Sequence, residues 1–408
     1  MGFFAPLRLC GEDFFKESMK KRWDIFCKVV DNFGDIGVCW RLAKQLAHEH
    51  SLQVRLFVDD VQVASKIIST ININKTSQII DNIEINLWNN ATVFDATADV
   101  VIEAFACELP QSYLDLMTPE TIWVNLEYLS AESWVADFHG KHSLIGNKKR
   151  HFFFPGFNEN TGGLIRENDA VRANQKWIPD TNPHLNPLPE GEEAIALSPS
   201  GRKLERGLAG MTADKEAFNI SLFCYEHAPL QALFHAAASG TQKATIYAPL
   251  THSIQKIAAF FDKEDLKAGD VLSKNQLTLQ VLPFLWQVDY DALLRTCDLN
   301  FVRGEDSWVR AIWAGKPFIW QPYAQTEGAH IVKLNAFLDV FYADLSAEQK
   351  TMVCEAHGYW LSGQGAEHVW DNYFKLLPEI TRGTQAKSQQ LAHQPDLASK
   401  LLIFCNNA

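Results

Sequence analysis

The feature that most constrains this chain is the segment 31–37, Asp-Asn-Phe-Gly-Asp-Ile-Gly, which joins two apolar stretches of different periodicity. Residues 24–30 predict a buried parallel strand, and in residues 38–46 the apolar side chains recur at helical spacing. Two carboxylates and two glycines therefore occupy a strand-to-helix turn, where open α/β sheets bind ligands. The alternative is that Asp31 and Asp35 only cap the helix. One aspartate would satisfy a cap, so the pair favours a site.

Length and composition indicate an ordinary globular protein with room for two domains. The chain has 408 residues, of which 47% are hydrophobic and 21% are charged. Its formal net charge of −12 argues against a protein that binds nucleic acid by neutralising phosphates. A basic segment of a protein partner remains compatible with this charge.

Metal, disulfide and membrane signals are weak. The 8 cysteines form no C-x-x-C pair, no histidines have H-E-x-x-H spacing, and no G-x-x-x-x-G-K-[ST] loop occurs. We therefore expect no disulfide framework, no cofactor and no required metal. No stretch is long and apolar enough to cross a bilayer, and residues 1–22 lack the layout of a signal peptide. These features predict a cytoplasmic protein with no membrane contact and no direct nucleic-acid binding.

Alternating strands and helices predict a doubly wound parallel sheet in the first half of the chain. The expected strands are residues 24–30, 53–58, 100–103 and 121–126. Polar residues follow these strands and should gather along one crevice. They are Asp31 and Asp35, Asp59 and Asp60, Glu103, and Glu127 with Tyr128. We interpret Asp59 and Asp60 as a solvated turn.

The second half repeats the α/β pattern after a change in composition near Pro179. We expect strands at 219–225, 243–247, 277–281 and 299–303, with helices at 229–239, 290–296 and 391–404. The predicted organisation is an extension (1–22), a first Rossmann-like domain (23–178), a flexible linker or insertion (179–210), a second Rossmann-like domain (211–385) and a C-terminal helix that packs back on the first domain (386–408). Such an arrangement predicts a deep cleft between two domains.

A second strand–turn–helix unit, residues 303–320, predicts a phosphate site. Asp306 or Ser307 should cap a short helix that Gly315 ends, and residues 318–320 should start the next strand. A helix N-terminus binds phosphate through free N–H groups, and Arg303 could hold a diphosphate bidentately. The alternative is that Arg303 only pairs with Glu305 or Asp306.

Three aromatic residues at strand ends suggest a site for a flat base. Phe284 and Tyr290 could sandwich it, with Phe223 alongside. Each ring taken singly is more often part of a core. Only their convergence on one sheet edge favours a binding role.

Five segments resemble the protein-arginine rhamnosyltransferases that modify elongation factor P. They are DNFGDIGVCWRL (31–42), VIEAFACELP (101–110), WVNLEYLS (123–130), FFPGF (153–157) and NFVRGEDS (300–307). The resemblance runs from about residue 23 to the C-terminus. It implies the GT-B glycosyltransferase architecture, in which two Rossmann-like domains face each other across a deep cleft.

The same resemblance implies an activity. L-rhamnose would pass from dTDP-β-L-rhamnose to an arginine of elongation factor P, with inversion and without a metal, and the modified factor would rescue ribosomes stalled at polyproline. Two alternatives stay open: a nucleotide-sugar epimerase of the same architecture, and a non-catalytic regulator that binds a sugar nucleotide.

Roles for individual residues follow from the resemblance. Asp31 would grip the acceptor guanidinium, and Asp35 would be the base. The donor would contact Phe223, Phe284, Tyr290, Arg303, Glu305, Asp306 and Ser307. Asn32, Gly34, Glu127 and Tyr128 are candidates for the acceptor side.

Overall fold

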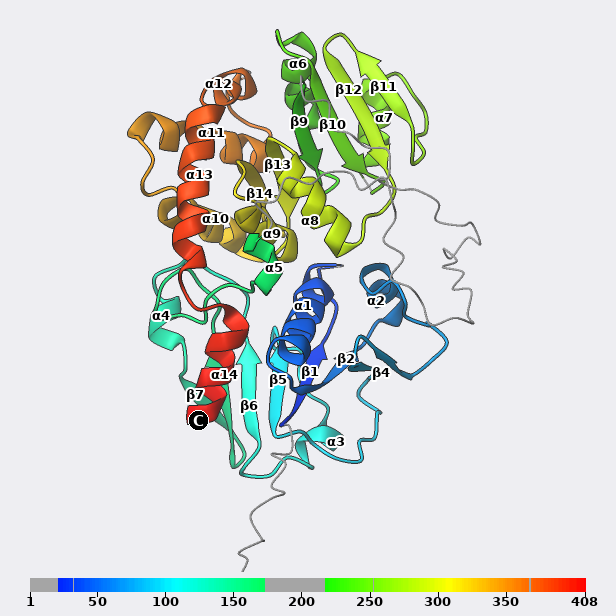
Figure 1. Cartoon of the computed structure of the whole chain (residues 1–408), viewed down its shortest axis with the longest axis vertical. Coiled ribbons are helices and arrows are strands. Elements are labelled where there is room, and N and C mark those ends of the chain that lie inside the picture. Colours follow the sequence, from blue (N-terminus) through cyan, green and yellow to red (C-terminus); the bar gives the residue numbers. More distant parts are fainter. Residues whose placement is uncertain (1–20, 32, 173–216, 252, 367) are drawn as a thin grey trace, which may run out of the picture.

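A computed structural model describes residues 21–31, 33–172, 217–251, 253–366 and 368–408, and this part of the chain contains two sheets. The first sheet has eight strands in the order β3-β4-β2-β1-β5-β6-β8-β7. Its strands are β1 (Arg22–Cys27), β2 (Gln53–Val58), β3 (Ser77–Ile80), β4 (Ile83–Leu87), β5 (Val100–Ala104), β6 (Ile122–Leu126), β7 (His142–Ile145) and β8 (Lys148–Phe153). In Figure 1 this sheet occupies the lower half of the molecule.

The second sheet has six strands in the order β11-β12-β10-β9-β13-β14 and occupies the upper half of Figure 1. Its strands are β9 (Phe218–Leu222), β10 (Ala244–Pro249), β11 (Val271–Lys274), β12 (Leu277–Leu282), β13 (Leu299–Arg303) and β14 (Phe318–Gln321). The two sheets belong to one α/β fold, in which helices connect most of the parallel strands. The predicted fold class is therefore confirmed.

The helices fall into one group before β9 and another after it. Before β9 come α1 (Gly34–His48), α2 (Val61–Ile67), α3 (Gln111–Leu114), α4 (Val135–Phe138) and α5 (Asn168–Arg172). After β9 come α6 (Leu230–Ser239), α7 (Ile254–Phe260), α8 (Gln287–Thr296), α9 (Asp306–Ala314), a short 3-10 turn (Thr326–Gly328), α10 (Ala329–Phe341), α11 (Ala347–Ser362), α12 (Val369–Lys375), α13 (Leu377–Ala392) and α14 (Leu397–Asn407).

Alternating side chains of the central strands build a core on both faces of the first sheet. On β1, Ile25 belongs to the large cluster beneath α1, whereas Phe26 belongs to a separate cluster on the other face. Leu56 and Phe57 of β2 divide in the same way. Because successive side chains of a strand point to opposite faces, the apolar residues of these two strands are buried on both faces of the sheet.

Two details of the sheets differ from the sequence-based expectation. The sheets are not purely parallel, because β3, β7 and β11 are antiparallel edge strands. They close hairpins whose short, half-exposed strands carry a weak apolar pattern. The strand expected at 24–30 ends at Cys27, since the next residues form the turn that leads to α1.

The C-terminal segment contains two helices where one was expected at 391–404. α13 ends at Ala392 and α14 begins at Leu397, because Pro395 interrupts the helical hydrogen bonds and Asp396 caps α14. In Figure 1, α13 runs from the upper half to the lower half, and α14 lies beside the first sheet. Lys400 of α14 donates to the carbonyls of Glu159 and Thr161 there.

The predicted linker lies outside the described residues, and so does the predicted extension apart from its last two residues. Among the helices that are described, none is long and apolar enough to span a membrane.

Candidate active site

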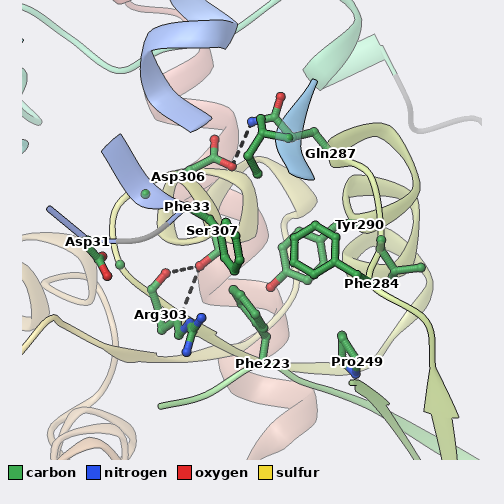
Figure 2. A pocket seen from close by; sticks show the side chains of 14 residues that line it. Asp31, Phe33, Phe223, Pro249, Phe284, Gln287, Tyr290, Arg303, Asp306 and Ser307 are labelled. Atoms are coloured by element: carbon green, nitrogen blue, oxygen red, sulfur yellow. Dashed lines mark hydrogen bonds between the residues drawn. The ribbon is translucent and has the colours of Figure 1, made fainter. Parts of the chain in front are cut away.

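A pocket lies where the carboxyl ends of the two sheets meet (Figure 2). The strands β1, β9, β10, β12 and β13 all end at this pocket. Its lining residues are Asp31, Phe33, Gly34, Ile67, Phe223, Pro249, Phe284, Leu285, Gln287, Tyr290, Arg303, Gly304, Asp306 and Ser307. This is the edge at which α/β sheets place ligands.

Asp31 of the first turn faces the second sheet. Its two carboxylate oxygens accept hydrogen bonds of 3.2 and 3.0 Å from the Tyr225 hydroxyl, which follows β9. One of these oxygens lies so close to Gly304 that a Cβ there would approach it to 2.7 Å. Burial raises the pKa of Asp31, and the nearby charge of Asp35 adds to the rise, while the Tyr225 hydrogen bond and Arg303 oppose it.

Asp35 lies behind this position and holds the turn together. Its Oδ2 accepts 2.8 and 2.9 Å hydrogen bonds from the backbone N–H groups of Val30 and Asp31. Its Oδ1 accepts a 3.1 Å hydrogen bond from the Tyr128 hydroxyl. Neither aspartate caps α1, whose N-cap is Phe33 without a side-chain hydrogen bond. The capping alternative is therefore wrong, and Asp35, which is 2% exposed, does not line the pocket.

Arg303 lies at the end of β13 with its guanidinium open to the pocket (Figure 2). The guanidinium lies over the rings of Phe223, at 4.3 Å, and Tyr225, at 4.7 Å, and donates to the Cys224 carbonyl at 3.2 Å. Among the described residues, no carboxylate lies within ion-pair distance of it. The expected alternative, pairing with Glu305 or Asp306, is thus wrong.

The N-terminus of α9 opens on the same pocket, but its capping differs from the expectation. The N-cap is Glu305 and makes no side-chain cap hydrogen bond. Ser307 uses its hydroxyl to bind the backbone of Arg303, accepting from its N–H at 3.0 Å and donating to its carbonyl. Gly315 ends the helix with φ 63°, as expected. Ser307 therefore fixes the position of Arg303 relative to the helix.

Four aromatic rings, those of Phe33, Phe223, Phe284 and Tyr290, line the pocket (Figure 2). Phe223 meets Tyr290 edge to face at 5.5 Å, and Phe33 packs against Phe284 at 4.9 Å. The three aromatic residues singled out from the sequence thus lie together at one sheet edge. Phe33, from the turn of the first domain, completes the apolar wall.

Glu305 and Glu127 do not line this pocket, although both were candidates. Glu305 reaches the first domain, where its Oε2 accepts a 2.9 Å hydrogen bond from the Leu129 N–H. Burial raises the pKa of Glu305 to about 7, and Lys333 opposes the rise. Glu127 accepts from the Asn125 amide, and burial raises its pKa.

Tyr128, a candidate for the acceptor side, is not among the residues that line the pocket. Its hydroxyl binds Asp35, its ring stacks on Phe105 at 4.3 Å, and the Lys333 ammonium lies 5.5 Å from the ring centre. Gly34 donates its N–H to the Asp31 carbonyl at 2.7 Å and lies at the pocket. Asn32 lies outside the described residues.

The residues expected to form a solvated turn have structural roles instead. Asp59 accepts a 2.9 Å hydrogen bond from the Val29 N–H, and Asp60 caps α2 by accepting from Gln62 and Val63. Asp59 therefore supports the turn that carries the aspartate pair.

Sequence reasoning missed Tyr225 and Gln287. Tyr225 is two residues beyond Phe223, so extended backbone directs both side chains to the same face. This spacing could have identified it. Gln287 donates 3.2 Å to Asp306 and 3.1 Å to the Gly37 carbonyl, and nothing in the local sequence signals these partners. Within the described residues, no group of three or more His, Cys, Asp or Glu side chains could hold a metal ion.

Comparisons with known proteins agree over nearly the whole chain. Residues 23–406 match the family model of the "Elongation-Factor P (EF-P) rhamnosyltransferase EarP". The chain is 39% identical to a protein-arginine rhamnosyltransferase of Pseudomonas aeruginosa, over 94% of this chain and 98% of the relative. It is 33% identical to one from Neisseria meningitidis, over 93% and 96%.

A solved structure has a similar fold at 28% identity. It comes from work on the structural basis for EarP-mediated arginine glycosylation of translation elongation factor EF-P. The match has a TM-score of 0.63 and covers 95% of this chain and 100% of that one. The glycosyltransferase of kitacinnamycin matches with a TM-score of 0.50 at 9% identity, over 94% and 98%, which concerns the fold alone.

Proposed function

This chain belongs to the EarP family of elongation factor P rhamnosyltransferases, and we propose that it transfers L-rhamnose from dTDP-β-L-rhamnose to an arginine side chain of elongation factor P. The product would be the modified translation factor that rescues ribosomes stalled at polyproline. The observation that carries the proposal is the pocket between the sheets, where Asp31 of one domain faces Arg303 of the other. An acceptor and an anionic donor can meet there.

The second domain would bind the donor. The rings of Phe223, Phe284 and Tyr290 offer flat apolar surfaces to a nucleobase. Arg303 is the cation without a carboxylate partner among the described residues that line the pocket, and it lies beside the α9 N-terminus. Free N–H groups and a guanidinium together suit a diphosphate.

The first domain would hold the acceptor arginine. A guanidinium is charged and delocalised, with a pKa above about 12, so it is a poor nucleophile until a proton is removed. Asp31 at the pocket would grip the fork of the guanidinium. Asp35 would orient it and accept the proton at Oδ1, the oxygen that the Tyr128 hydroxyl also contacts.

The reaction would be a direct displacement. A guanidinium nitrogen forms a bond to the anomeric carbon while the bond from that carbon to the diphosphate oxygen breaks, which inverts the centre. The proton leaves the nitrogen for Asp35, and the electron pair leaves with the diphosphate. Arg303 and the N–H groups of α9 would stabilise the charge that develops there.

General base catalysis accounts for only part of such a rate. It typically contributes about 10²–10⁴-fold, so orientation and electrostatic stabilisation would supply most of the acceleration. We expect the reaction to need no added metal, because Arg303 and the helix would carry the leaving-group charge. Since the proposed acceptor is a translation factor, we expect the reaction to occur in the cytoplasm.

The test is the intact mass of unmodified elongation factor P after incubation with this protein and dTDP-L-rhamnose, with and without a chelator. We expect one added deoxyhexose in both samples and none when the acceptor arginine is replaced by lysine. No added mass from a folded sample that binds dTDP would contradict the proposal. The epimerase and regulator alternatives receive no support from the comparisons, whose matched relatives are transferases.

A further inference from the structure

Arg41 of α1 lies behind the donor pocket and contacts three carboxylates at once. Its Nε donates to Asp306 Oδ1 at 2.6 Å, one terminal nitrogen donates to Asp291 Oδ1 at 2.9 Å, and the other reaches Glu167 Oε1 at 3.2 Å. These partners come from α9, from α8 and from the segment before α5. The Arg41 side chain is 3% exposed, so water does not screen these contacts.

Asp306 is the partner that lines the pocket. Its second oxygen accepts from the Gln287 amide at 3.2 Å, so both oxygens of the carboxylate are held. Gly37 of α1 packs so closely against it that a Cβ at this position would meet the Asp306 carboxyl carbon at 3.1 Å. The first helix of one domain therefore touches the first turn of the phosphate-facing helix of the other.

A carboxylate at this place has an electrostatic consequence for the donor. Asp306 lies in the pocket beside Arg303 and Ser307, where the diphosphate of the proposed donor would lie. Two like charges at short range in a partly buried site repel each other strongly. The carboxylate is compatible with a diphosphate there only if its own charge is compensated.

We propose that Arg41 is a positioning residue of the donor site, which neutralises Asp306 and fixes its carboxylate so that α9 can accept a diphosphate. The inference rests on the proposed function, because it needs an anionic nucleotide donor. An arginine suits the role since its rigid fork can serve carboxylates in three directions, whereas a lysine ammonium is a single point charge. The contact also ties donor binding to the mutual position of the two domains.

Arg310 provides a matched control within the same cluster. It contacts two of the three carboxylates that Arg41 contacts, Glu167 and Asp291, the latter through Oδ2 at 2.9 Å. Its side chain is 4% exposed. Among the described contacts it has none with Asp306. A merely structural role of the cluster would make the two arginines equivalent.

The experiment compares Arg41→Lys with Arg310→Lys in the full chain, using the dissociation constant for dTDP from calorimetry. Loss of a charge-assisted hydrogen bond to Asp306 should weaken dTDP binding at least about tenfold in Arg41→Lys. Arg310→Lys should stay within about twofold of the wild type. Steady-state rates should show a raised KM for the donor in Arg41→Lys and an unchanged KM for elongation factor P.

Two further variants test the inference apart from the comparison with Arg310→Lys, and Gly37→Ala does so even if Arg41→Lys does not fold. Gly37→Ala pushes a methyl group against the Asp306 carboxylate without removing a charge, and it should also weaken dTDP binding. Adding Asp306→Asn to Arg41→Lys removes the uncompensated charge and should restore part of the dTDP affinity. Equal dTDP affinities of the two lysine variants, or no effect of Gly37→Ala, would overturn the inference alone. A folded wild type that does not bind dTDP would overturn the proposed function as well.

Discussion

Arg303 and Arg310 are nearly equally buried, at 8% and 5% exposed, but their surroundings differ. The Arg310 guanidinium forms ion pairs with Glu167 and Asp291, two carboxylates that Arg41 also contacts. Arg303 faces two aromatic rings and one carbonyl instead. A buried arginine that is saturated with carboxylates stabilises the domain contact, whereas one without a carboxylate keeps its capacity to bind an anion. Burial alone does not separate the two roles, but the partners do.

The electrostatics of Glu167 agree with a structural role for Arg310. Burial opposes ionisation of Glu167, but Arg310 and Arg41 lower its pKa to about 2. The carboxylate therefore stays charged through the physiological range. Asp31, at the open side, shows the opposite behaviour, because burial outweighs its favourable contacts and raises its pKa.

The largest effect is expected from replacing Asp35. This replacement tests whether a carboxylate whose contacts are all internal has only a structural role, as we expect for Arg310. All its contacts are internal, as in the saturated cluster, yet we propose it as the base. Asp35→Asn should lower kcat by about 10²–10⁴-fold and leave dTDP binding unchanged. Single-turnover rates and calorimetry would measure both, with the melting temperature as a control for the turn. A folded variant with near-normal kcat would remove Asp35 as the base.

Replacing each of the two arginines with alanine, one at a time, tests the comparison directly. Arg303→Ala should weaken dTDP binding by about 10–100-fold with little change in stability, since no ion pair is lost. Arg310→Ala should leave dTDP binding unchanged and lower the free energy of unfolding by about 3–5 kcal/mol, because it leaves buried carboxylates uncompensated. Calorimetry would measure the dTDP dissociation constant of each variant, and urea denaturation would measure its free energy of unfolding. An unchanged dTDP dissociation constant in Arg303→Ala would contradict its phosphate role.

A pH-dependent effect is expected at Glu305, which joins the two domains through Leu129. Its pKa in the folded chain, about 7, lies above the ordinary value of 4.5, so the folded state holds the proton more tightly than the unfolded state. Stability from this group is present below pH 4.5 and is lost as pH rises through 7. Between pH 5 and 7 the wild type should lose about 2 kcal/mol relative to Glu305→Gln, measured by urea denaturation. If the free energies of unfolding of the two proteins changed equally with pH, the raised pKa of Glu305 would be contradicted.

The smallest effect is expected from Gly304→Ala, which tests the open side of the pocket. Gly304 has φ 59°, and an added Cβ would approach Asp31 Oδ2 to 2.7 Å. Gly315→Ala is the matched control, because φ is 63° and the nearest atom to its Cβ would be 3.8 Å away. Both should lose about 1–2 kcal/mol of stability, the cost of left-handed backbone for a residue with a side chain. Only Gly304→Ala should lower kcat; equal kcat values would show that Asp31 tolerates displacement.

Much of the fold was predictable because its strands carry local signals. β2 and β13 have the predicted boundaries, and α1 contains the predicted helix at 38–46. The edge hairpins were missed because β3, β7 and β11 are short and half exposed, so no apolar run marks them. The break before α14 could have been inferred from Pro395 and Asp396, and the helical periodicity on either side concealed it.

The candidate site was partly predictable for a topological reason. Asp31, Phe223 and Arg303 each follow or end a parallel strand, and parallel strands bring their carboxyl ends to one edge. The motifs that resemble the rhamnosyltransferase family indicated most of the other candidate site residues. Neither source indicated that Glu305 reaches out of the pocket to the first domain, because that depends on a contact 176 residues away.

The amino-acid sequence alone specifies the local units: two strand-to-helix turns, their glycines and the residues placed at strand ends. Periodicity and turn chemistry act over a few residues, so they are legible without a fold. The tertiary fold sets which charged side chains form ion pairs and which are available to a ligand. Arg41 and Asp306 are 265 residues apart in the chain, and their 2.6 Å contact exists because α1 and α9 meet between the sheets. Because Asp306 pairs with Arg41, it does not pair with Arg303, and the Arg303 guanidinium stays available to an anion.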